Sequence, residues 1–227
     1  MNMNKNMKEI IGGSLAVSMV MFSGFTVLEP QFVSAVTTTQ DQVVVSQTVT
    51  SDISITSPAD TSMSRALTTT EDTAVGTTTW NVKTNSRTGY TMTIAASSTA
   101  GCQDHDGLGV PDALCDKNTG EAFNDIATTS KATWSVSNGY FFGWSALGNH
   151  TTGFGTGSFC NAAAHVPSTT LLYQGFDGTR TYQFASSTSE TNQAGTDTNV
   201  CFAVEQETVY APSGSFQATT TATATIQ

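Results

Sequence analysis

The sequence predicts an all-β domain behind an export signal, and three observations support this fold class. Apolar and polar residues alternate with period two along many short segments, which is the pattern of half-buried strands. Threonine, which is β-branched and suits the solvent side of a strand, makes up 40 of the 192 residues from 36 to 227. Glycine-rich stretches connect the segments, and no convincing amphipathic helix of ordinary length interrupts them. We therefore expect a sandwich or barrel of about eight strands.

The first 35 residues have the features of a signal peptide. Lys5 and Lys8 form a positively charged start, a long apolar stretch follows, and Val33-Ser34-Ala35 is a small-residue cleavage pattern. We expect cleavage after Ala35, which leaves residues 36–227 as a single domain long enough to bury one core. The mature chain is expected outside the cell, either secreted or associated with the cell surface, with no membrane span after cleavage.

The mature chain begins with a strongly patterned segment. Val43, Val45, Val49, Ile53 and Ile55 share one parity, which predicts one or two half-buried strands before a break at residues 57–60. A Ser/Thr-rich glycosylated stalk is the alternative interpretation of such composition. The alternation with apolar residues favours strands.

A hairpin is expected next. Residues 77–83 form a strand around Trp80, residues 85–89 have turn composition, and Tyr90, Met92 and Ile94 mark a returning strand. Residues 100–125 then interrupt the pattern with glycine, proline and aspartate, and we expect a loop insertion there. Further strands are expected at residues 132–136, 140–144, 171–174, 180–185, 200–205 and 215–226.

Charge and cysteine content limit the possible partners and compartment. Eight Lys and Arg against 18 Asp and Glu give a net charge of −10, and an acidic surface repels phosphate backbones, so nucleic acid is not expected as a partner. The four cysteines of an exported chain predict two disulfides, for which three pairings exist. We favour Cys102–Cys115 with Cys160–Cys201, because the first pair brackets a compact loop.

The bracketed loop has the composition of a cation site. Counted from Asp104 as position 1, Asp106, Gly109 and Asp112 fall at positions 3, 6 and 9 of a calcium loop, in which carboxylates supply oxygen ligands and glycine permits the turn. Residues 104–116 resemble a thrombospondin type-3 calcium repeat. This resemblance implies Ca²⁺ as a bound ion with a stabilising role.

Two positions depart from that repeat. Leu108 stands where a third aspartate is expected, and Cys115 occupies position 12, where a bidentate carboxylate is the usual ligand. Asp116 is the nearest carboxylate that can replace it, with Glu121 as a second candidate. The alternative is an acidic loop held by its disulfide alone.

No catalytic or cofactor-binding residues are predicted. His105, His150 and His165 are the only histidines, and none lies near a nucleophile motif. The segment 143–148 misses the nucleophile-elbow spacing by one residue and has no helix after it. We therefore expect a protein that is not an enzyme.

Several features together resemble secreted or fimbria-like bacterial surface proteins with one Ig-like, Greek-key β-sandwich. These features are the signal, Ser57-Pro58-Ala59-Asp60, the tryptophan strand that leads into Asn85–Tyr90, and the threonine-rich last strand. The resemblance implies a structural or adhesive role, with self-assembly or binding to cell-surface or matrix components. The segments 42–55 and 215–226 carry few charges and are candidates for pairing between molecules.

The sequence is also compatible with two other functions. A carbohydrate-binding module requires an exposed aromatic platform, for which Tyr140, Phe141, Phe142 and Trp144 are the candidates. We favour a packing role for these four side chains. A secreted hydrolase requires convergent polar groups in a cleft.

Overall fold

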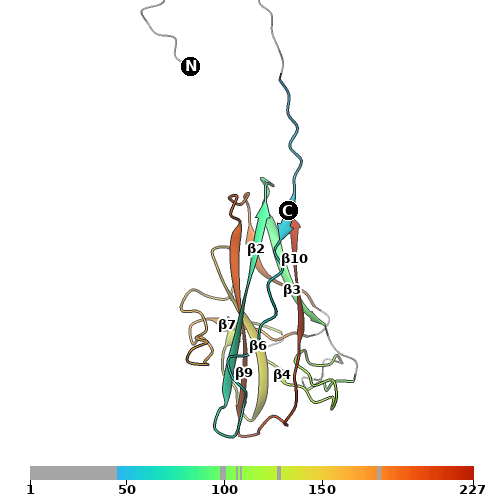
Figure 1. Ribbon diagram of the computed structural model, residues 1–227, viewed down its shortest axis with the longest axis vertical. Coiled ribbons are helices and arrows are strands. Elements are labelled where there is room, and N and C mark those ends of the chain that lie inside the picture. Colours follow the sequence, from blue (N-terminus) through green and yellow to red (C-terminus); the bar gives the residue numbers. More distant parts are fainter. Residues whose placement is uncertain (1–44, 98–100, 106, 108, 127–128, 178–179) are drawn as a thin grey trace, which may run out of the picture. The chain divides into compact units, whose positions relative to one another are not determined.

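The structure is a computed structural model that describes residues 45–97, 101–105, 107, 109–126, 129–177 and 180–227. The chain divides into two units, Met1–Gln47 and Thr48–Gln227, and the fold below is that of the second unit (Figure 1). The expected signal peptide, residues 1–35, lies outside the described residues.

The fold is all-β, as the alternating pattern predicts. The ten strands are β1 (Ile53–Ile55), β2 (Thr73–Thr84), β3 (Tyr90–Ser97), β4 (Asn124–Asp125), β5 (Ala132–Thr133), β6 (Gly139–Leu147), β7 (Leu172–Tyr173), β8 (Tyr182–Ser187), β9 (Thr196–Glu207) and β10 (Thr219–Ile226). The described residues contain no helix, and hence no helix that is long and apolar enough to cross a membrane.

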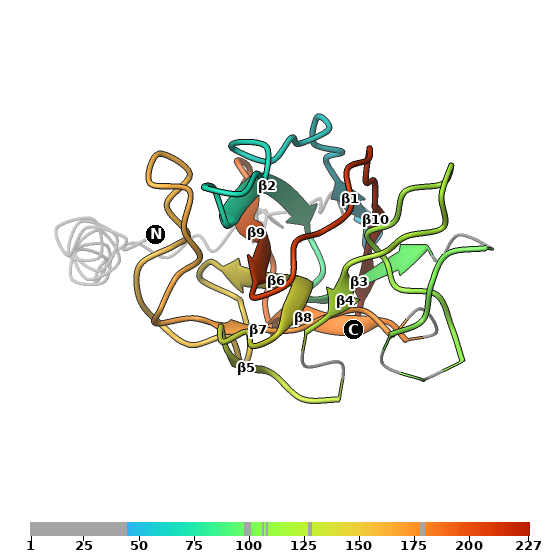
Figure 2. The ribbon, with the colours of Figure 1, turned by 90° about the horizontal axis from the view of Figure 1, so that it is seen from below.

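Two sheets form the body of the domain. One has the order β1-β2-β9-β6-β4 and the other β10-β3-β8, while β5 and β7 form a small third sheet. Figure 2 looks along the strands and shows β3 and β8 on one side and β2 and β9 on the other. All pairs are antiparallel except β4 with β6.

The main core lies between these two sheets. It is built from alternate residues of β2, β3, β6, β8 and β9, because successive side chains of a strand point to opposite faces. The largest fully buried side chains that these strands contribute are Trp144, Tyr90, Phe142, Phe184 and Met92. Burying side chains of this size stabilises the fold by roughly 1.5–3 kcal/mol each.

The expected hairpin of residues 77–94 is wrong. Both strands form, but β2 pairs with β1 and β9, whereas β3 pairs with β10 and β8. The turn between Thr84 and Tyr90 therefore carries the chain from one sheet to the other. Period-two alternation identifies a strand and its buried face, but it does not identify the neighbour with which the strand pairs.

A smaller core covers the outer face of the five-stranded sheet. Val75, Cys201 and Ala203 point to this face from β2 and β9, and they pack with Leu171 and Tyr173. β9 is thus buried on both faces, which explains the unbroken apolar run from Val200 to Val204.

The structure contains two disulfides, Cys102–Cys115 and Cys160–Cys201, with Cα atoms 6.1 and 6.2 Å apart. These are the two pairings that the sequence analysis favoured. Cys160–Cys201 ties the long connection between β6 and β7 to the central strand β9. Cys102–Cys115 closes the loop between β3 and β4.

Candidate functional site

One flank of the two-sheet body is closed by main-chain hydrogen bonds. The chain leaves β6 and continues along β8, where Ser186 N–H donates to the His150 carbonyl (2.8 Å) and Thr152 N–H donates to the Phe184 carbonyl (3.1 Å). The outer edge of β6 is covered as well, by β4 and by Gln174. We call this side, with the covered edges of β6 and β8, the closed flank.

The closed flank is also densely packed. Trp144 exchanges two main-chain hydrogen bonds with Gln174, of 2.8 and 2.9 Å. Its ring lies against Phe154 and Phe176, with centroids 4.8 and 5.6 Å away. No partner strand can approach β6 here without displacing this cover.

The opposite flank ends in β10, whose outer edge is open. In an antiparallel pair, alternate residues turn both N–H and C=O toward the partner strand. Gln227 N–H donates to the Gly89 carbonyl (3.3 Å), and Gln217 exchanges two hydrogen bonds with Cys115, so the odd-numbered residues face the β3 side. The even-numbered residues turn their main-chain groups outward, and these are Thr220, Ala222, Ala224 and Ile226. In the part of the chain that the structure describes, no hydrogen bond reaches these four groups from another strand.

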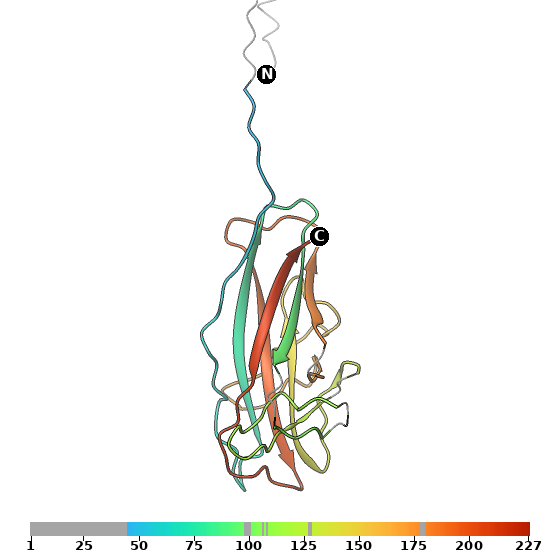
Figure 3. The ribbon, with the colours of Figure 1, turned by 90° about the vertical axis from the view of Figure 1, so that its right-hand side faces the viewer.

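The core is also incompletely covered on this side. Nearly all the half-buried apolar residues that pack against the main core lie on two segments: Ile53, Ile55, Met63 and Leu67 on one, and Ala211, Phe216, Ala218, Ala222 and Ala224 on the other. β1 lies beside β10 at one end of this pair of segments. We call the strip between the two segments the open seam. Figure 3 shows β10, in red, running along this side between β2 and β3.

A largely apolar cavity continues the open seam near the start of β10. It has a volume of about 530 Å³, and Met63, Leu67, Ala211 and Phe216 are among the residues that line it. Its one cationic side chain, Arg65, already forms ion pairs with Glu71 and Asp72. The cavity thus offers apolar surface rather than charge to a ligand.

β10 lacks the features that usually protect an edge strand. Such strands are typically short, charged, interrupted by proline or bulged. β10 has eight residues, its register with β3 is unbroken, and residues 215–227 contain no charge and no proline. An edge of this kind is suited to accept a further strand.

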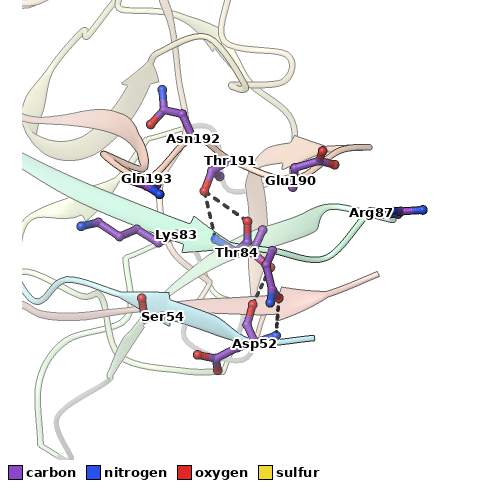
Figure 4. A pocket seen from close by; sticks show the side chains of 10 residues that line it. Asp52, Ser54, Lys83, Thr84, Arg87, Glu190, Thr191, Asn192 and Gln193 are labelled. Atoms are coloured by element: carbon purple, nitrogen blue, oxygen red, sulfur yellow. Dashed lines mark hydrogen bonds between the residues drawn. The ribbon is translucent and has the colours of Figure 1, made fainter. Parts of the chain in front are cut away.

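A polar pocket lies at the end of the sheets where β1 begins. Figure 4 shows its lining, in which Lys83 and Arg87 point to opposite sides and Asp52 points away from both. Thr84 holds this junction together, since its N–H donates to Thr191 Oγ1 (3.0 Å) and its hydroxyl to the Asp52 carbonyl (2.7 Å). The charged groups do not converge, so we assign this pocket no chemistry.

The described acidic residues among those that the sequence analysis singled out accept hydrogen bonds from neighbouring groups. Asp104 accepts hydrogen bonds from Gly107 and Gly109 N–H (2.8 and 2.7 Å), and Asp112 accepts one from His105 N–H (3.0 Å). Within the described residues, no group of three or more His, Cys, Asp or Glu side chains is placed to hold a metal ion. Asp106 lies outside the described residues.

Asp116 has a structural role that explains its burial. Its carboxylate accepts hydrogen bonds from Asn118 N–H (2.9 Å) and Ser215 N–H (3.0 Å), and these bonds hold its pKa below the usual range. The residue thereby joins the loop between β3 and β4 to the chain that enters β10. Calcium binding by this loop stays a prediction.

The histidines do not form a nucleophile–base pair in the described structure. His105 Nδ1 lies 2.7 Å from the buried carboxylate of Asp112, whose pKa is raised by burial, with the hydrogen bonds from His105 opposing that rise. His150 Nδ1 lies 2.8 Å from the Tyr90 hydroxyl. Within the described residues, neither ring is hydrogen-bonded to a serine, threonine or cysteine.

The aromatic run on β6 packs rather than forming a platform. Phe142 and Trp144 are fully buried in the main core, and Tyr140 packs edge-on against Phe123 with centroids 5.3 Å apart. Among the large apolar side chains exposed in the described residues, Tyr210 is the only aromatic. A flat sugar-binding face is therefore not built from the predicted residues.

Comparison with protein-family models, with curated proteins and with solved structures finds no match to this chain. The candidate site consequently rests on geometry. Sequence reasoning made residues 215–226, which contain β10, a candidate for pairing between molecules but missed Met63 and Leu67, which belong to no strand. Their only signal was that two large apolar residues occur in an otherwise polar stretch.

Proposed function

We propose that this is a non-enzymatic, secreted or cell-surface structural or adhesive protein that assembles by adding a strand to β10. The two disulfides are compatible with an extracellular location. We also assign the sandwich to the Ig-like, Greek-key class. This assignment is supported by the way β2 to β3 and β8 to β9 pass between the two sheets.

The open outer edge of β10 is the observation that carries this proposal. The outer edges of β6 and β8 are covered by other parts of the chain, whereas in the described residues no strand pairs with the outer edge of β10, which has β1 beside it at one end. Main-chain groups of an added strand would satisfy the outward groups of β10, and its side chains would cover the half-buried residues of the open seam. Both effects favour association.

The test uses the mature chain, residues 36–227, in size-exclusion chromatography with light scattering and in electron microscopy. The wild type is expected to form concentration-dependent assemblies. Ala222→Pro removes one outward N–H and is expected to reduce assembly strongly, because proline at that position cannot donate to an added strand. Ala222→Ser keeps the N–H and is the matched control. A wild type that stays monomeric at all concentrations and hydrolyses a glycan or peptide would overturn the proposal.

Calcium is the remaining expectation for the acidic loop, and calorimetry of the mature chain with Ca²⁺ tests it. Binding heat that is lost in Asp104→Asn and Asp106→Asn would establish the site. No heat, and no rise of Tm with Ca²⁺, would leave a loop held by its disulfide and its own hydrogen bonds.

A further inference from the structure

We propose that the apolar cavity near the start of β10 binds a large apolar side chain of a partner polypeptide that carries lysine or arginine beside that side chain. The inference concerns a different surface from the outer edge of β10 and goes beyond the proposed function. It follows from four features of the cavity: its buried floor, the engagement of its polar groups, the exposed side chains at its mouth, and the carboxylates around it.

The cavity reaches the main core. Its walls come from residues 63–69 and 210–216, which lie outside the strands. Leu114, Phe123 and Val204 also line it, although each belongs to the main core and is at most 8% exposed. The volume of about 530 Å³ is that of a ligand pocket, for which about 300–1,000 Å³ is typical. A side chain that enters the cavity would therefore be covered by core residues on its inner side.

The polar side chains of the lining are already engaged. The Gln206 amide donates to the Thr68 carbonyl (2.6 Å) and accepts from Ala211 N–H (3.1 Å). Arg65 donates to the Thr73 carbonyl (2.6 Å) in addition to its ion pairs. A polar ligand group would lose its hydration without gaining these partners, so the cavity selects an apolar group.

Apolar surface continues outside the cavity. Val209 and Tyr210 are 47% and 58% exposed, and the Tyr210 hydroxyl reaches the Thr69 carbonyl of the other wall (3.5 Å). Thr208, just before them, has a φ of 65°, which a β-branched residue rarely adopts. Val209 does not line the cavity, so a small ligand held inside would leave it exposed. A partner that extends beyond the mouth, as a polypeptide does, would cover it.

The charges around the cavity favour a cationic partner. Arg65 is the only cation among the described residues that line it, and Glu71 and Asp72 lie beside it. Asp116 adds a third carboxylate at the opposite wall, where it accepts from Ser215 N–H (3.0 Å). Together with the net charge of −10, these groups attract lysine and arginine. They disfavour a second copy of this chain and an anionic membrane, since both would be repelled.

The probe is the peptide N-acetyl-Lys-Thr-Phe-Thr-Lys-amide, added to the mature chain with ¹³C-labelled methionine methyl groups. Residues 36–227 contain two methionines, Met63 in the cavity wall and Met92 in the main core. The NMR spectrum therefore has one reporter at the site and one internal control. We expect the peptide to shift the Met63 signal and to leave the Met92 signal in place.

Two further peptides separate the apolar contribution from the charge. With alanine in place of phenylalanine, the affinity should fall by at least about tenfold, because the ring no longer buries apolar surface. With glutamate in place of both lysines, it should fall by about threefold to tenfold at low salt. That second difference should shrink at about 1 M salt, where exposed charges are screened.

Two variants of the chain test the site itself. Tyr210→Ser removes the aromatic ring at the mouth, and Ala211→Phe fills the cavity from its wall. Each should weaken binding of the phenylalanine peptide by at least about fivefold. Val166→Ser is the matched control, since Val166 is also exposed but does not line the cavity, and its effect should be less than about twofold. Thermal unfolding verifies the fold of each variant, and Tyr210→Ser decides the matter if Ala211→Phe does not fold.

A Met63 signal that the phenylalanine peptide does not shift, or that the alanine peptide shifts equally, would overturn this inference. Binding to phosphatidylglycerol vesicles in place of the peptide would do the same. Light scattering of the same samples reports assembly separately. Assembly without peptide binding would leave the proposed function standing, whereas peptide binding by a strictly monomeric protein would keep this inference and remove self-assembly.

Discussion

The two flanks of the domain differ in how the outer edges of their strands are covered. On the closed flank, His150 and Thr152 complete the edge of β8, and Gln174 covers β6 beside Trp144. On the open flank, β10 presents alternate main-chain groups that no described residue pairs, above alanines that are only half-buried. In the described part of the chain, the strand edges of one flank are thus covered, whereas the outer edge of β10 on the other flank is not paired with a strand.

The two flanks are therefore expected to contribute differently to the stability of the domain and to its association. The closed flank contains the largest buried side chains, and changes there should unfold the domain. The open flank contributes small side chains and unpaired main-chain groups, and changes there should alter association more than folding. The predictions that follow separate these two outcomes.

The largest expected effect is on the closed flank. Trp144→Ala removes the ring that packs against Phe154 and Phe176, and it should lower the free energy of unfolding by about 3–5 kcal/mol. Urea denaturation of the mature chain measures it. Ala224→Gly on the open flank is the control, with an expected loss of about 1 kcal/mol. Equal losses at the two positions would contradict the contrast.

The second effect concerns the disulfide that fastens the long connection to β9. Cys160→Ser/Cys201→Ser should lower the free energy of unfolding by roughly 2–4 kcal/mol, since it opens a loop with a sequence separation of 41 residues. Cys102→Ser/Cys115→Ser opens a loop with a separation of only 13 residues and should cost less. Thermal unfolding of both double variants ranks them, and a reversed order would show that the loop near β10 is the stronger constraint.

The third effect is a pH dependence from the small core. Burial raises the pKa of Tyr173 to about 12, although the hydrogen bond from Ser168 N–H opposes the rise. The folded state therefore favours the neutral phenol. Its contribution to stability is complete below pH 10 and is lost as the pH rises from about 10 through 12.

Tyr173→Phe removes this titration and should flatten part of the alkaline fall in stability. At neutral pH the variant should be less stable by about 1–3 kcal/mol, because Ser168 N–H loses its acceptor. Tyr182, whose pKa is also raised to about 12 by burial, contributes to the remaining alkaline dependence, as do Tyr90 and Tyr140, whose pKa values burial also raises. An unchanged pH profile of unfolding in Tyr173→Phe would assign the dependence to these other tyrosines.

The smallest expected effect on folding is at the open edge. Ala222→Pro should change the free energy of unfolding by less than about 1 kcal/mol, since its N–H points away from β3. Thr223→Pro removes a ladder hydrogen bond and should cost more, about 1–3 kcal/mol, because the acceptor on β3 loses its donor. Similar losses for the two neighbours would show that the assignment of inward and outward residues in β10 is wrong.

The sequence predicts where the strands lie better than it predicts which strands pair with one another. Trp80, Met92 and Ile94 identify buried faces by parity alone, because a strand buries every second residue. The partners of β2 and β3 depend on contacts with β9 and β10, which lie more than 100 residues away for most pairs. Local alternation carries no information on such pairing, and for that reason the expected hairpin failed.

The sequence likewise predicts only part of the candidate site. The β pattern and the absence of charge in residues 215–227 make this segment a candidate for pairing from sequence alone, whereas its position at an edge and the half-buried state of Met63 and Phe216 require the fold. In the acidic loop, the spacing of the aspartates suggested that their carboxylates share an ion. In the structure, Asp112 is hydrogen-bonded to His105, and Asp116 is hydrogen-bonded to Asn118 and Ser215. Spacing along the chain does not determine where these side chains point, and Ca²⁺ binding by this loop stays a prediction.

Amide hydrogen exchange along β10, measured in dispersed and in assembled mature protein, tests the central claim most directly. In the dispersed protein, the odd-numbered amides from Thr219 to Thr225 should exchange slowly and the even-numbered amides from Thr220 to Ile226 quickly, because only the odd set is paired with β3. In the assembled protein, both sets should exchange slowly. Even-numbered amides that stay fast in the assemblies, or that are already slow in the dispersed protein, would contradict the claim that this edge is open and accepts a strand.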